Sequence, residues 1–455
     1  MFEYKEGQRV TKASTDKYFE LDGICEDDQI SRDGKGSFSL DDEFMRMIAK
    51  YSQGLESIII EIDNYLSSID DIDLKLISNT TLFSNIANFV ENNVFDSPYF
   101  ENAIHVLYKI ISPDMMHYEQ YINCVLIEKL IIALENRPNL IINILYIFYS
   151  IISLNPNENS EIFDKLAIYH HVYVLLLNEP INQVIYLASL IFKATMIASY
   201  ERFPEEIIQI GVKILGLGFN KAIIQVMDAV CSISPNSKPK MKSILATELF
   251  NHLIPFLLSE DDELSMWALT DVISVFETES KKCILSLVDI GLLDVIKKML
   301  VIGKPEQQEF IEYIVNRVIM INMDYVDVLI SNDILALICD NSQSGAFITR
   351  RVSIAFLCEL LSCTHSKEIW EVLLNQGGVI NMIDYLESSD EDTEKSIIMA
   401  FEHLLTIDPK SADYLIENNI ISVLESINVE NPNFTASMAL IERIQTEKFR
   451  NENSL

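Results

Sequence analysis

The chain has 455 residues, of which 49% are hydrophobic, so it holds enough apolar material for several compact domains or for one long repeat array. Its 13 Gly and 12 Pro are few for this length, which argues against β-sandwiches and doubly wound sheets, because those folds need many turns. The formal net charge of −34 opposes direct binding to nucleic acid; it either keeps an apolar array soluble or attracts basic segments of a partner.

The chain begins with a polar stretch, residues 1–42, in which Asp, Glu, Ser, Gly and Lys are frequent and apolar periodicity is weak. We expect an acidic, flexible leader there. A helical part is expected over residues 43–446 and a polar C-terminal tail over residues 447–455. The segment from Phe44 to Ser67 predicts a partial repeat that caps the array.

The most apolar run of the chain extends from Leu140 to Leu154 and ends before Asn155 and Pro156. It is too short to cross a bilayer, which takes about 20 apolar residues in a helix. We therefore predict a buried helix and no membrane insertion.

Turn segments followed by apolar helical runs recur along the chain at a nearly constant interval. Residues 289–300 (DIGLLDVIKKML) and 375–386 (NQGGVINMIDYL) are two copies. One turn residue marks each copy: Thr81, Val125, His170, Glu206, Glu248, Gly291, Asp333, Gly377 and Asn419. These anchors lie about 42 residues apart on average, within the range of armadillo and HEAT repeats.

The copy at Gly291 predicts three helices per repeat. The first spans residues 281–289, the second spans residues 292–300, and the third begins near Pro305, because Pro is tolerated in the first turn of a helix. Residues 310–318 of the third helix carry the apolar stripe of a buried helix. Armadillo repeats have three helices and HEAT repeats two, so the sequence predicts an all-α armadillo-type solenoid. We expect a right-handed superhelix of about nine to ten repeats with the third helices on its concave side.

Two segments resemble the importin-α (karyopherin-α) branch of the armadillo family. Residues 266–271 (MWALTD) are similar to the Trp-Ala-Leu-x-Asn signature of the third helices in that family, and residues 69–90 are similar to its first repeat. As a repeat architecture, the resemblance covers residues 44–446. It implies a concave groove that holds an extended basic peptide, with Asn side chains bonded to the peptide backbone and lysines held between Trp rings.

Candidate partner-binding residues follow from the third-helix positions of each repeat. At these positions this chain has mixed side chains instead of Asn. Its leader is also acidic, whereas the leader of the importin-α family is basic. Trp267 and Tyr313 are the aromatic candidates, either as interface anchors or as packing between repeats. Ser274 is an alternative to Asp271. The candidates are Lys109, Ser150, Met196, Ser232, Trp267, Asp271, Tyr313, Arg317, Glu359 and His403.

Neither the cysteines nor the acidic loops predict a metal site, and we expect no cofactor. The seven Cys are odd in number and form no CxxC pair, which indicates reduced thiols in the cytoplasm or the nucleus. Cys358, Cys363 and His365 fit no standard zinc spacing. Residues 31–42 resemble an EF-hand loop, but Lys35 occupies a ligand position, so we interpret them as a polar turn.

The sequence contains no spacing typical of a nucleotide loop, a kinase, a serine hydrolase or a zinc protease, so we expect no enzyme. It predicts a non-catalytic, monomeric scaffold or adaptor that binds an extended segment of another protein in the groove. That segment is basic in one version of the hypothesis, and neither nucleic acid nor membrane is involved. Two alternatives stay open: a divergent importin-α-like nuclear import adaptor, and a structural subunit of a larger complex.

Overall fold

The computed structural model describes ten stretches of the chain. They are residues 42–69, 74–93, 97–112, 122–178, 181–197, 203–233, 238–302, 305–321, 325–363 and 367–453. The predicted leader lies outside them except for Asp42, as do His365 and nearly all of the EF-hand-like loop. The regular elements of the described residues are α-helices and short 3-10 helices.

The described residues belong to two compact units that divide within α13, between Val226 and Met227, with Phe203 in the second unit. The helices of unit 1 are α2 (Asp42–Ser52), α3 (Ile58–Ser67), α4 (Leu74–Ser78), α5 (Leu82–Asn92), α6 (Phe100–Ile110), α7 (Cys124–Asn136), η4 (Pro138–Leu140), α8 (Ile141–Leu154), α9 (Pro156–Lys165), α10 (Ile168–Asn178), α11 (Asn182–Ile197), α12 (Glu205–Leu215) and the start of α13 (Asn220–Cys231).

Unit 2 continues from the end of α13. Its helices are α14 (Lys238–Leu245), α15 (Leu249–Leu253), η5 (Ile254–Leu258), α16 (Asp262–Glu277), α17 (Lys281–Asp289), α18 (Leu292–Ile302), α19 (Pro305–Ile321), α20 (Tyr325–Ser331), α21 (Ile334–Ser344), α22 (Phe347–Cys363), α23 (Lys367–Asn375), α24 (Gly378–Leu386), α25 (Glu391–Ile407), α26 (Ser411–Glu417), α27 (Ile420–Glu425) and α28 (Phe434–Asn453).

Successive helices form the three-helix repeats that the sequence predicts. Around Gly291 the first, second and third helices are α17, α18 and α19, and α17 has the predicted bounds. Seven repeats have three described helices, and their third helices are α6, α11, α16, α19, α22, α25 and α28. The helices α8 and α13 are also third helices; residues 113–121 and 198–202, which precede their second helices, are not described. The predicted partial repeat is α2 and α3.

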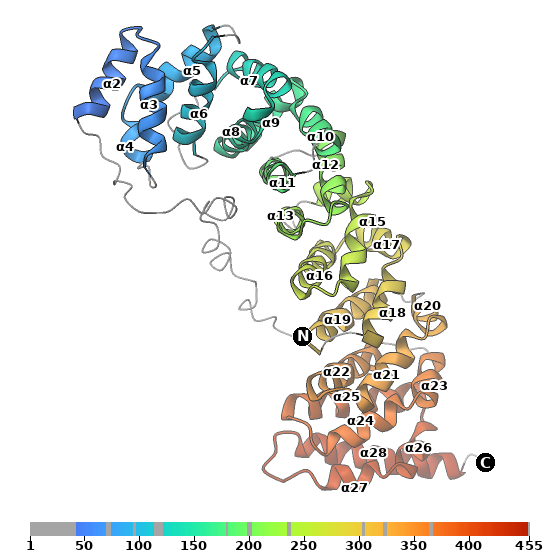
Figure 1. Ribbon diagram of the computed structural model, residues 1–455. Helices are drawn as coiled ribbons and strands as arrows, with labels where there is room; N and C mark the ends of the chain where they lie inside the picture. The colour runs from blue at the N-terminus through green and yellow to red at the C-terminus, as the bar shows by residue number, and fades with distance from the viewer. Residues whose placement is uncertain are drawn as a thin grey trace. The chain divides into compact units, whose positions relative to one another are not determined.

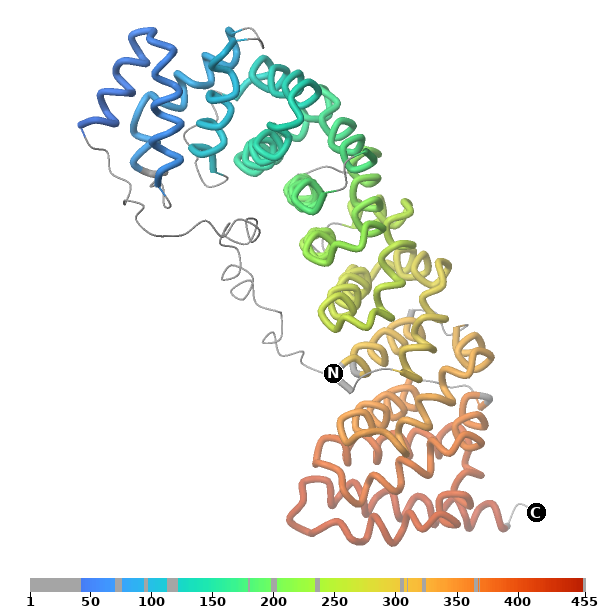
Figure 2. Tube along the Cα trace, in the orientation of Figure 1, coloured from blue at the N-terminus to red at the C-terminus, as the bar shows by residue number. Residues whose placement is uncertain are grey.

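Equivalent helices of neighbouring repeats pack side by side within each unit. The third helices α3, α6, α8 and α11 form such a row in unit 1, and α16, α19, α22, α25 and α28 form one in unit 2 (Figure 1). The second helices of unit 2, from η5 through α18, α21 and α24 to α27, form a parallel row, which Figure 2 follows along the Cα trace. Each repeat therefore covers its apolar sides mainly against its neighbours.

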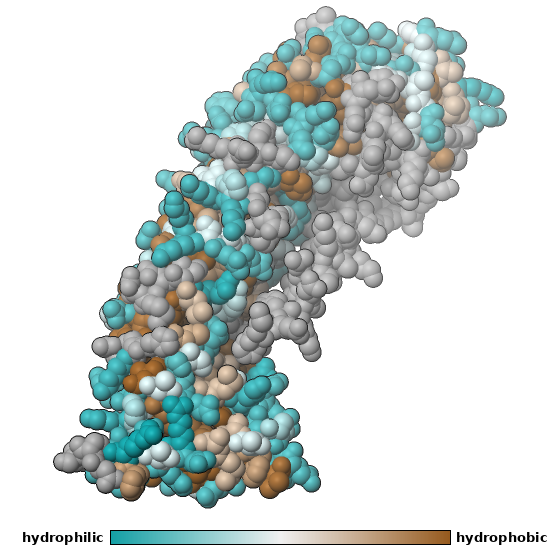
Figure 3. Space-filling view, turned by 180° about the vertical axis from the view of Figure 1, so that it is seen from behind, coloured by the Kyte–Doolittle hydropathy of each residue, from teal (hydrophilic) through white to brown (hydrophobic). Residues whose placement is uncertain are grey.

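The core lies between the rows of helices and consists of apolar stripes. In α19, Ile311, Ile314, Val315 and Val318 are each at most 1% exposed, as the sequence predicts. Burying one such side chain stabilises the fold by roughly 1.5–3 kcal/mol. On the face shown in Figure 3, by contrast, hydrophobic groups are scattered among hydrophilic ones.

The apolar run from Leu140 to Leu154 forms η4 and α8, and its side chains Ile144, Ile147 and Phe148 are fully buried. This run is therefore a core helix of unit 1, as predicted. Among the described helices, none combines the length and the hydrophobicity that a bilayer span requires.

The turn between first and second helices uses a left-handed backbone conformation in several repeats. This conformation is unfavourable for residues with a Cβ atom, which explains why Gly, Asn and Asp are common there. The residues with this conformation are Ala167 (φ 53°), Gly291 (96°), Asp333 (61°), Gly377 (75°) and Asn419 (62°). Four of the predicted turn residues are confirmed in this way; in the repeat of α9 to α11 the turn lies at Ala167 and not at His170.

Hydrogen bonds link equivalent positions of neighbouring repeats and repeat the period of the sequence. Each of the following pairs is separated by 42 residues in the chain. They are Gln307 Nε2 to Ser265 Oγ (3.1 Å), Asn381 Nδ2 to the Cys339 carbonyl (3.0 Å) and Asn433 Nδ2 to the Glu391 carbonyl (2.7 Å). These bonds satisfy buried polar groups and fix how far each repeat slides along the next.

The segment predicted as a polar tail, residues 447–455, is helical as far as Asn453, where α28 ends. Arg450 donates to Glu447 across 2.7 Å at i,i+3 spacing, which stabilises the last turns of the helix, and Asn451 donates to the Pro409 carbonyl.

Gly377→Ala should lower the free energy of unfolding by about 1–2 kcal/mol, because an alanine in the left-handed region is strained. A Cβ atom there would make only an ordinary contact, 3.7 Å from Ile380, so the strain comes from φ and not from crowding. The matched control is Gly216→Ala at the end of α12, where φ is −84°. Urea unfolding should show a lower midpoint for the first variant and an equal or higher one for the control.

Candidate partner-binding face

The candidate residues belong to the third helices, whose outer sides we call the third-helix face. Nine of the ten predicted residues lie on third helices, and Ser232 follows the last residue of α13. Their helices are α6 (Lys109), α8 (Ser150), α11 (Met196), α16 (Trp267 and Asp271), α19 (Tyr313 and Arg317), α22 (Glu359) and α25 (His403).

The structure leaves part of this set accessible. Ser232 is exposed, and Lys109, Trp267, Tyr313, Arg317, Glu359 and His403 are half-buried. Their role in binding remains a prediction.

Three candidates need a correction, because their side chains are buried inside the array. Ser150 and Asp271 are 0% exposed and Met196 is 2% exposed, so none of them can contact a partner in this conformation. The cause is the helical register: one residue turns a side chain by about 100° around the helix. Tyr149, which precedes Ser150, is half-buried, and Thr270, which precedes Asp271, is exposed.

In unit 2 the two candidate rings lie on adjacent third helices, α16 and α19. Trp267 is on the first, and Tyr313 and Arg317 are on the second. The Arg317 guanidinium lies 5.9 Å from the centre of the Tyr313 ring and 3.6 Å from the Glu279 carboxylate. A cation at this distance from a ring is attracted to its face, which orients both side chains. Burial raises the pKa of Tyr313, so its hydroxyl stays protonated at neutral pH.

A shallow hollow lies at the other end of this row, between α25 and the segment that leads into α28. Carboxylates surround an apolar floor there, with one lysine among them. The residues that line it include Glu391, Asp392, Lys395, Met399, Glu402 and Asn433. Met399 is 55% exposed, so the apolar floor is accessible. This combination suits a side chain with an aliphatic stem and a positive end.

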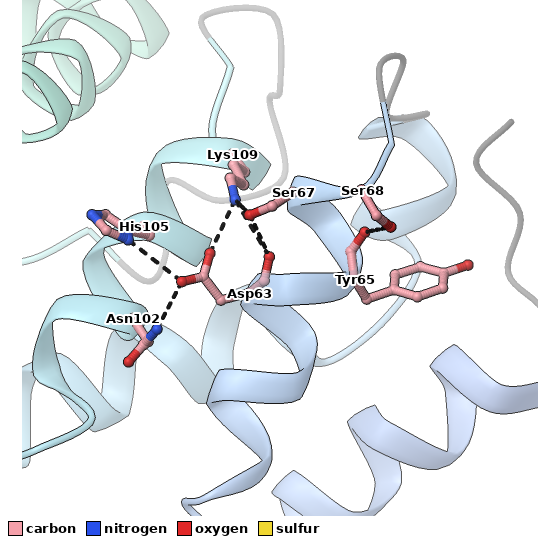
Figure 4. Close-up of polar contacts among 7 residues, drawn as sticks. All are labelled: Asp63, Tyr65, Ser67, Ser68, Asn102, His105 and Lys109. Carbon is pink, nitrogen blue, oxygen red and sulfur yellow. Dashed lines mark hydrogen bonds and ion pairs between the residues drawn. The ribbon is translucent and has the colours of Figure 1, made fainter. Parts of the chain in front are cut away.

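In unit 1, Lys109 is held by a buried carboxylate between α3 and α6 (Figure 4). Lys109 Nζ lies 3.0 Å from Asp63 Oδ1 and also donates to Ser67. Asn102 donates to Asp63 Oδ2 across 2.8 Å, and His105 Nδ1 lies 3.4 Å from the same oxygen. Lys109 therefore joins two neighbouring third helices, and its charge is balanced within the protein.

Two buried aspartates have opposite protonation properties. Burial alone would raise the pKa of Asp63, but hydrogen bonds from His105, Asn102 and Lys109 outweigh it and lower the pKa to about 2. Asp271 has no such partners. Burial, followed by the nearby Asp228 carboxylate, raises its pKa well above 3.8, although the Cys231 thiol donates to it across 2.8 Å. Asp63 is thus an anion at neutral pH, whereas burial favours the protonated form of Asp271.

The prediction from sequence missed an aromatic cluster on the third helices of unit 1. We call Tyr108, Tyr146, Tyr149 and Tyr186 the tyrosine face; all four are half-buried. The rings of Tyr108 and Tyr146 lie 5.0 Å apart edge to face, and those of Tyr146 and Tyr149 lie 6.2 Å apart. A signal existed in the sequence, because Tyr108, Tyr146 and Tyr186 follow one another at nearly the repeat period.

In the described part of the chain, no group of three or more His, Cys, Asp or Glu side chains is arranged to hold a metal ion. Cys358 is buried in α22 and Cys363 is exposed at its end. Burial raises the pKa of both thiols, so neither is activated as a nucleophile.

Asp63→Asn should destabilise the protein at pH 7 by an amount on the order of 2 kcal/mol, because it removes an anion whose pKa is lower in the folded state. In the wild type this stabilisation is present above pH 4 and is lost as the pH falls toward about 2. Urea unfolding between pH 2 and pH 7 should show that loss in the wild type and in Asp164→Asn, an exposed control on α9. A pH profile of Asp63→Asn that parallels the wild type would contradict the assignment.

Asp271→Asn should have the opposite effect and stabilise the protein at pH 7. Above about pH 4 the carboxyl ionises in the unfolded chain, whereas burial raises its pKa in the folded chain, so stability declines as the pH rises above about 4. The amide is neutral in both states and avoids this penalty. The stability difference between variant and wild type should therefore grow from about pH 4 upward. A variant that is less stable than the wild type at pH 7 would show that the carboxyl is required.

Comparisons with known proteins concern the fold. No family model matches the chain, and no curated protein matches it significantly. Among solved structures, an engineered protein from a structural genomics consortium is 15% identical, with a TM-score of 0.54; the match covers 89% of this chain and 99% of that chain. A computationally designed armadillo repeat protein for modular peptide recognition is 14% identical over 51% of this chain and 98% of that chain, with a TM-score of 0.45. With its three-helix repeats, the chain has an armadillo-type repeat fold.

Proposed function

We propose that this protein is a non-catalytic scaffold whose third-helix face binds an extended segment of a partner protein. The supporting observation is the row of adjacent third helices in unit 2, which carries half-buried Trp267 on α16 and half-buried Tyr313 and Arg317 on the neighbouring α19. Large rings and arginine that are partly covered before binding are the side chains that most often dominate the energy of an interface. The cytoplasm or the nucleus is the proposed compartment, since the six described cysteines are free thiols.

An extended segment suits this face better than a compact ligand. The hollow between α25 and the segment that leads into α28 is open, so it would bury a single side chain of a chain that crosses several helices. The hollow between α25 and α28 is mainly acidic, which favours a basic side chain at that point of the segment. Elsewhere the face carries both signs, as Arg317 and Glu359 illustrate.

The importin-α-like adaptor is a second candidate, favoured by the half-buried Trp267 on α16 and by the acidic hollow. It requires side chains that bond the peptide backbone at equivalent third-helix positions. Asn performs this in the family that the sequence resembles, whereas the half-buried residues found in this chain are Lys109, Arg317, Glu359 and His403. Titration with a lysine-rich nuclear localisation peptide should therefore give binding in the millimolar range or none. Micromolar binding would favour the import adaptor over a general scaffold.

A structural subunit of a larger complex is a third candidate, supported by apolar side chains at the turns between second and third helices. Ile302 is 77% exposed at the end of α18, Phe347 is 65% exposed at the start of α22, and Val429 is 73% exposed before α28. Exposed apolar side chains in equivalent turns are typical of surfaces that a partner covers permanently. Gel filtration from the native cell would then show a stoichiometric complex instead of a monomer.

Trp267→Ala and Tyr313→Ala should each weaken capture of the native partner by about thirty-fold, since an anchoring ring contributes about 2 kcal/mol or more to binding. The matched control is Tyr325→Ala. Tyr325 is a half-buried tyrosine of unit 2 that lies on α20, the first helix of its repeat. Affinity purification of tagged full-length chains with quantitative mass spectrometry provides the measurement. Equal partner recovery by all three variants would contradict the proposed face.

A further inference from the structure

We propose that the tyrosine face of unit 1 binds a neutral, proline-rich segment in the polyproline II conformation. The proposal rests on the proposed function, because it names the kind of segment that the third helices of unit 1 accept. Two observations support it, the arrangement of the rings and the charges around them, and the ordinary spacing of packed helices agrees with it.

Three of the rings contact one another across two adjacent third helices. α8 packs between α6 and α11, and it contributes two rings, Tyr146 and Tyr149. Tyr108 on α6 contacts Tyr146 edge to face, and Tyr146 contacts Tyr149. Tyr186 lies on the next third helix, α11, and burial raises its pKa to about 12. The half-buried rings offer faces and edges, the kind of surface that proline rings pack on.

The spacing of the helices matches a polyproline II helix. Neighbouring packed helices lie about 8–10 Å apart. A polyproline II chain makes one turn in three residues and rises about 9 Å per turn. One turn of such a segment therefore spans the step from α6 to α8, or from α8 to α11. A β-extended segment advances about 7 Å per two residues and comes out of step with the rings.

The charges near the tyrosine face favour a neutral segment over a basic one. The chain has 68 acidic residues, yet α8 contains no charged residue and α11 contains only Lys193. Lys193 donates to Gln225 Oε1 across 3.2 Å, and Lys109 is paired with Asp63. On α6, Glu101 is paired with Arg137 across 3.0 Å. A lysine-rich segment would thus lack the carboxylates that it finds elsewhere on the protein, whereas a proline-rich one loses little by their absence.

Polyproline II segments also bind at a low entropic cost, because proline restricts the free chain to nearly the bound conformation. Their backbone carbonyls carry no internal hydrogen bonds, so a tyrosine hydroxyl can donate to them. Ile197, 57% exposed at the end of α11, extends the apolar surface beyond Tyr186.

The test is calorimetric titration of the full-length chain with a peptide of about 12 prolines, which makes about four polyproline II turns. A glycine-serine peptide and a lysine-arginine peptide of equal length are the comparison ligands. We expect the proline peptide to bind in the micromolar range and the other two at least about ten-fold more weakly. Tyr146→Ala and Tyr186→Ala should each weaken the proline peptide about ten-fold.

Tyr173→Ala is the matched control, because Tyr173 is a half-buried tyrosine of unit 1 that lies on α10, the second helix of its repeat. It should leave the affinity unchanged, and Tyr146→Phe, which keeps the ring, should retain most of it. If Tyr146→Ala fails to fold, the comparison of Tyr186→Ala with Tyr173→Ala decides the question. Equal binding of all three peptides, or equal losses in Tyr186→Ala and Tyr173→Ala, would overturn the proposal.

The outcome for the proposed function is separate. If the proline peptide does not bind but Trp267→Ala and Tyr313→Ala still lose the native partner, the tyrosine face is refuted and the scaffold function stands. If the proline peptide binds through the tyrosines while the unit 2 variants keep the partner, the tyrosine face stands and the unit 2 face is refuted.

Discussion

The fold depends on one constraint: the apolar stripe of each helix is covered jointly by the other helices of its own repeat and by helices of the neighbouring repeats. The buried stripe of α19, for example, lies in a row with the stripes of α16 and α22. Short helices such as α26 and α27 would be unstable alone, since isolated helices need about 12–15 residues even with favourable sequences. Their stability comes from packing, and the outer sides of the third helices are left to vary in sequence.

The effect of burial on the pKa of a carboxyl group in this array depends on the side chains that surround it. Asp63 is nearly as buried as Asp271, but three donors from α6 surround it and hold it as an anion. Asp271 lies near the Cys231 thiol and the Asp228 carboxylate, and burial raises its pKa. Asp63 joins two repeats through charge, whereas burial of Asp271 favours its uncharged form. Residue type alone therefore says little about charge in the interior of a repeat protein.

The sequence is sufficient to predict the repeat period, the three helices per repeat and several turns, because these depend on local patterns. Gly291 and Gly377 mark their turns correctly, since the left-handed backbone there favours glycine. The third-helix register is less predictable, because a one-residue error moves a side chain from the surface into the core. Ser150 and Asp271 show this error, and Tyr149 lies one residue from the first. The tyrosine face depends on contacts between repeats, which a single helical pattern does not contain.

The hydrogen bonds between residues 42 positions apart restrict how the length of this protein can change in evolution. Inserting a few residues into a helix would separate Gln307 from Ser265 and deprive the buried Gln307 amide of this acceptor. Duplicating or deleting an entire repeat would instead present the same donor to an equivalent acceptor. Natural relatives should therefore differ in length by whole repeats, or by residues within loops, and rarely by small insertions inside helices.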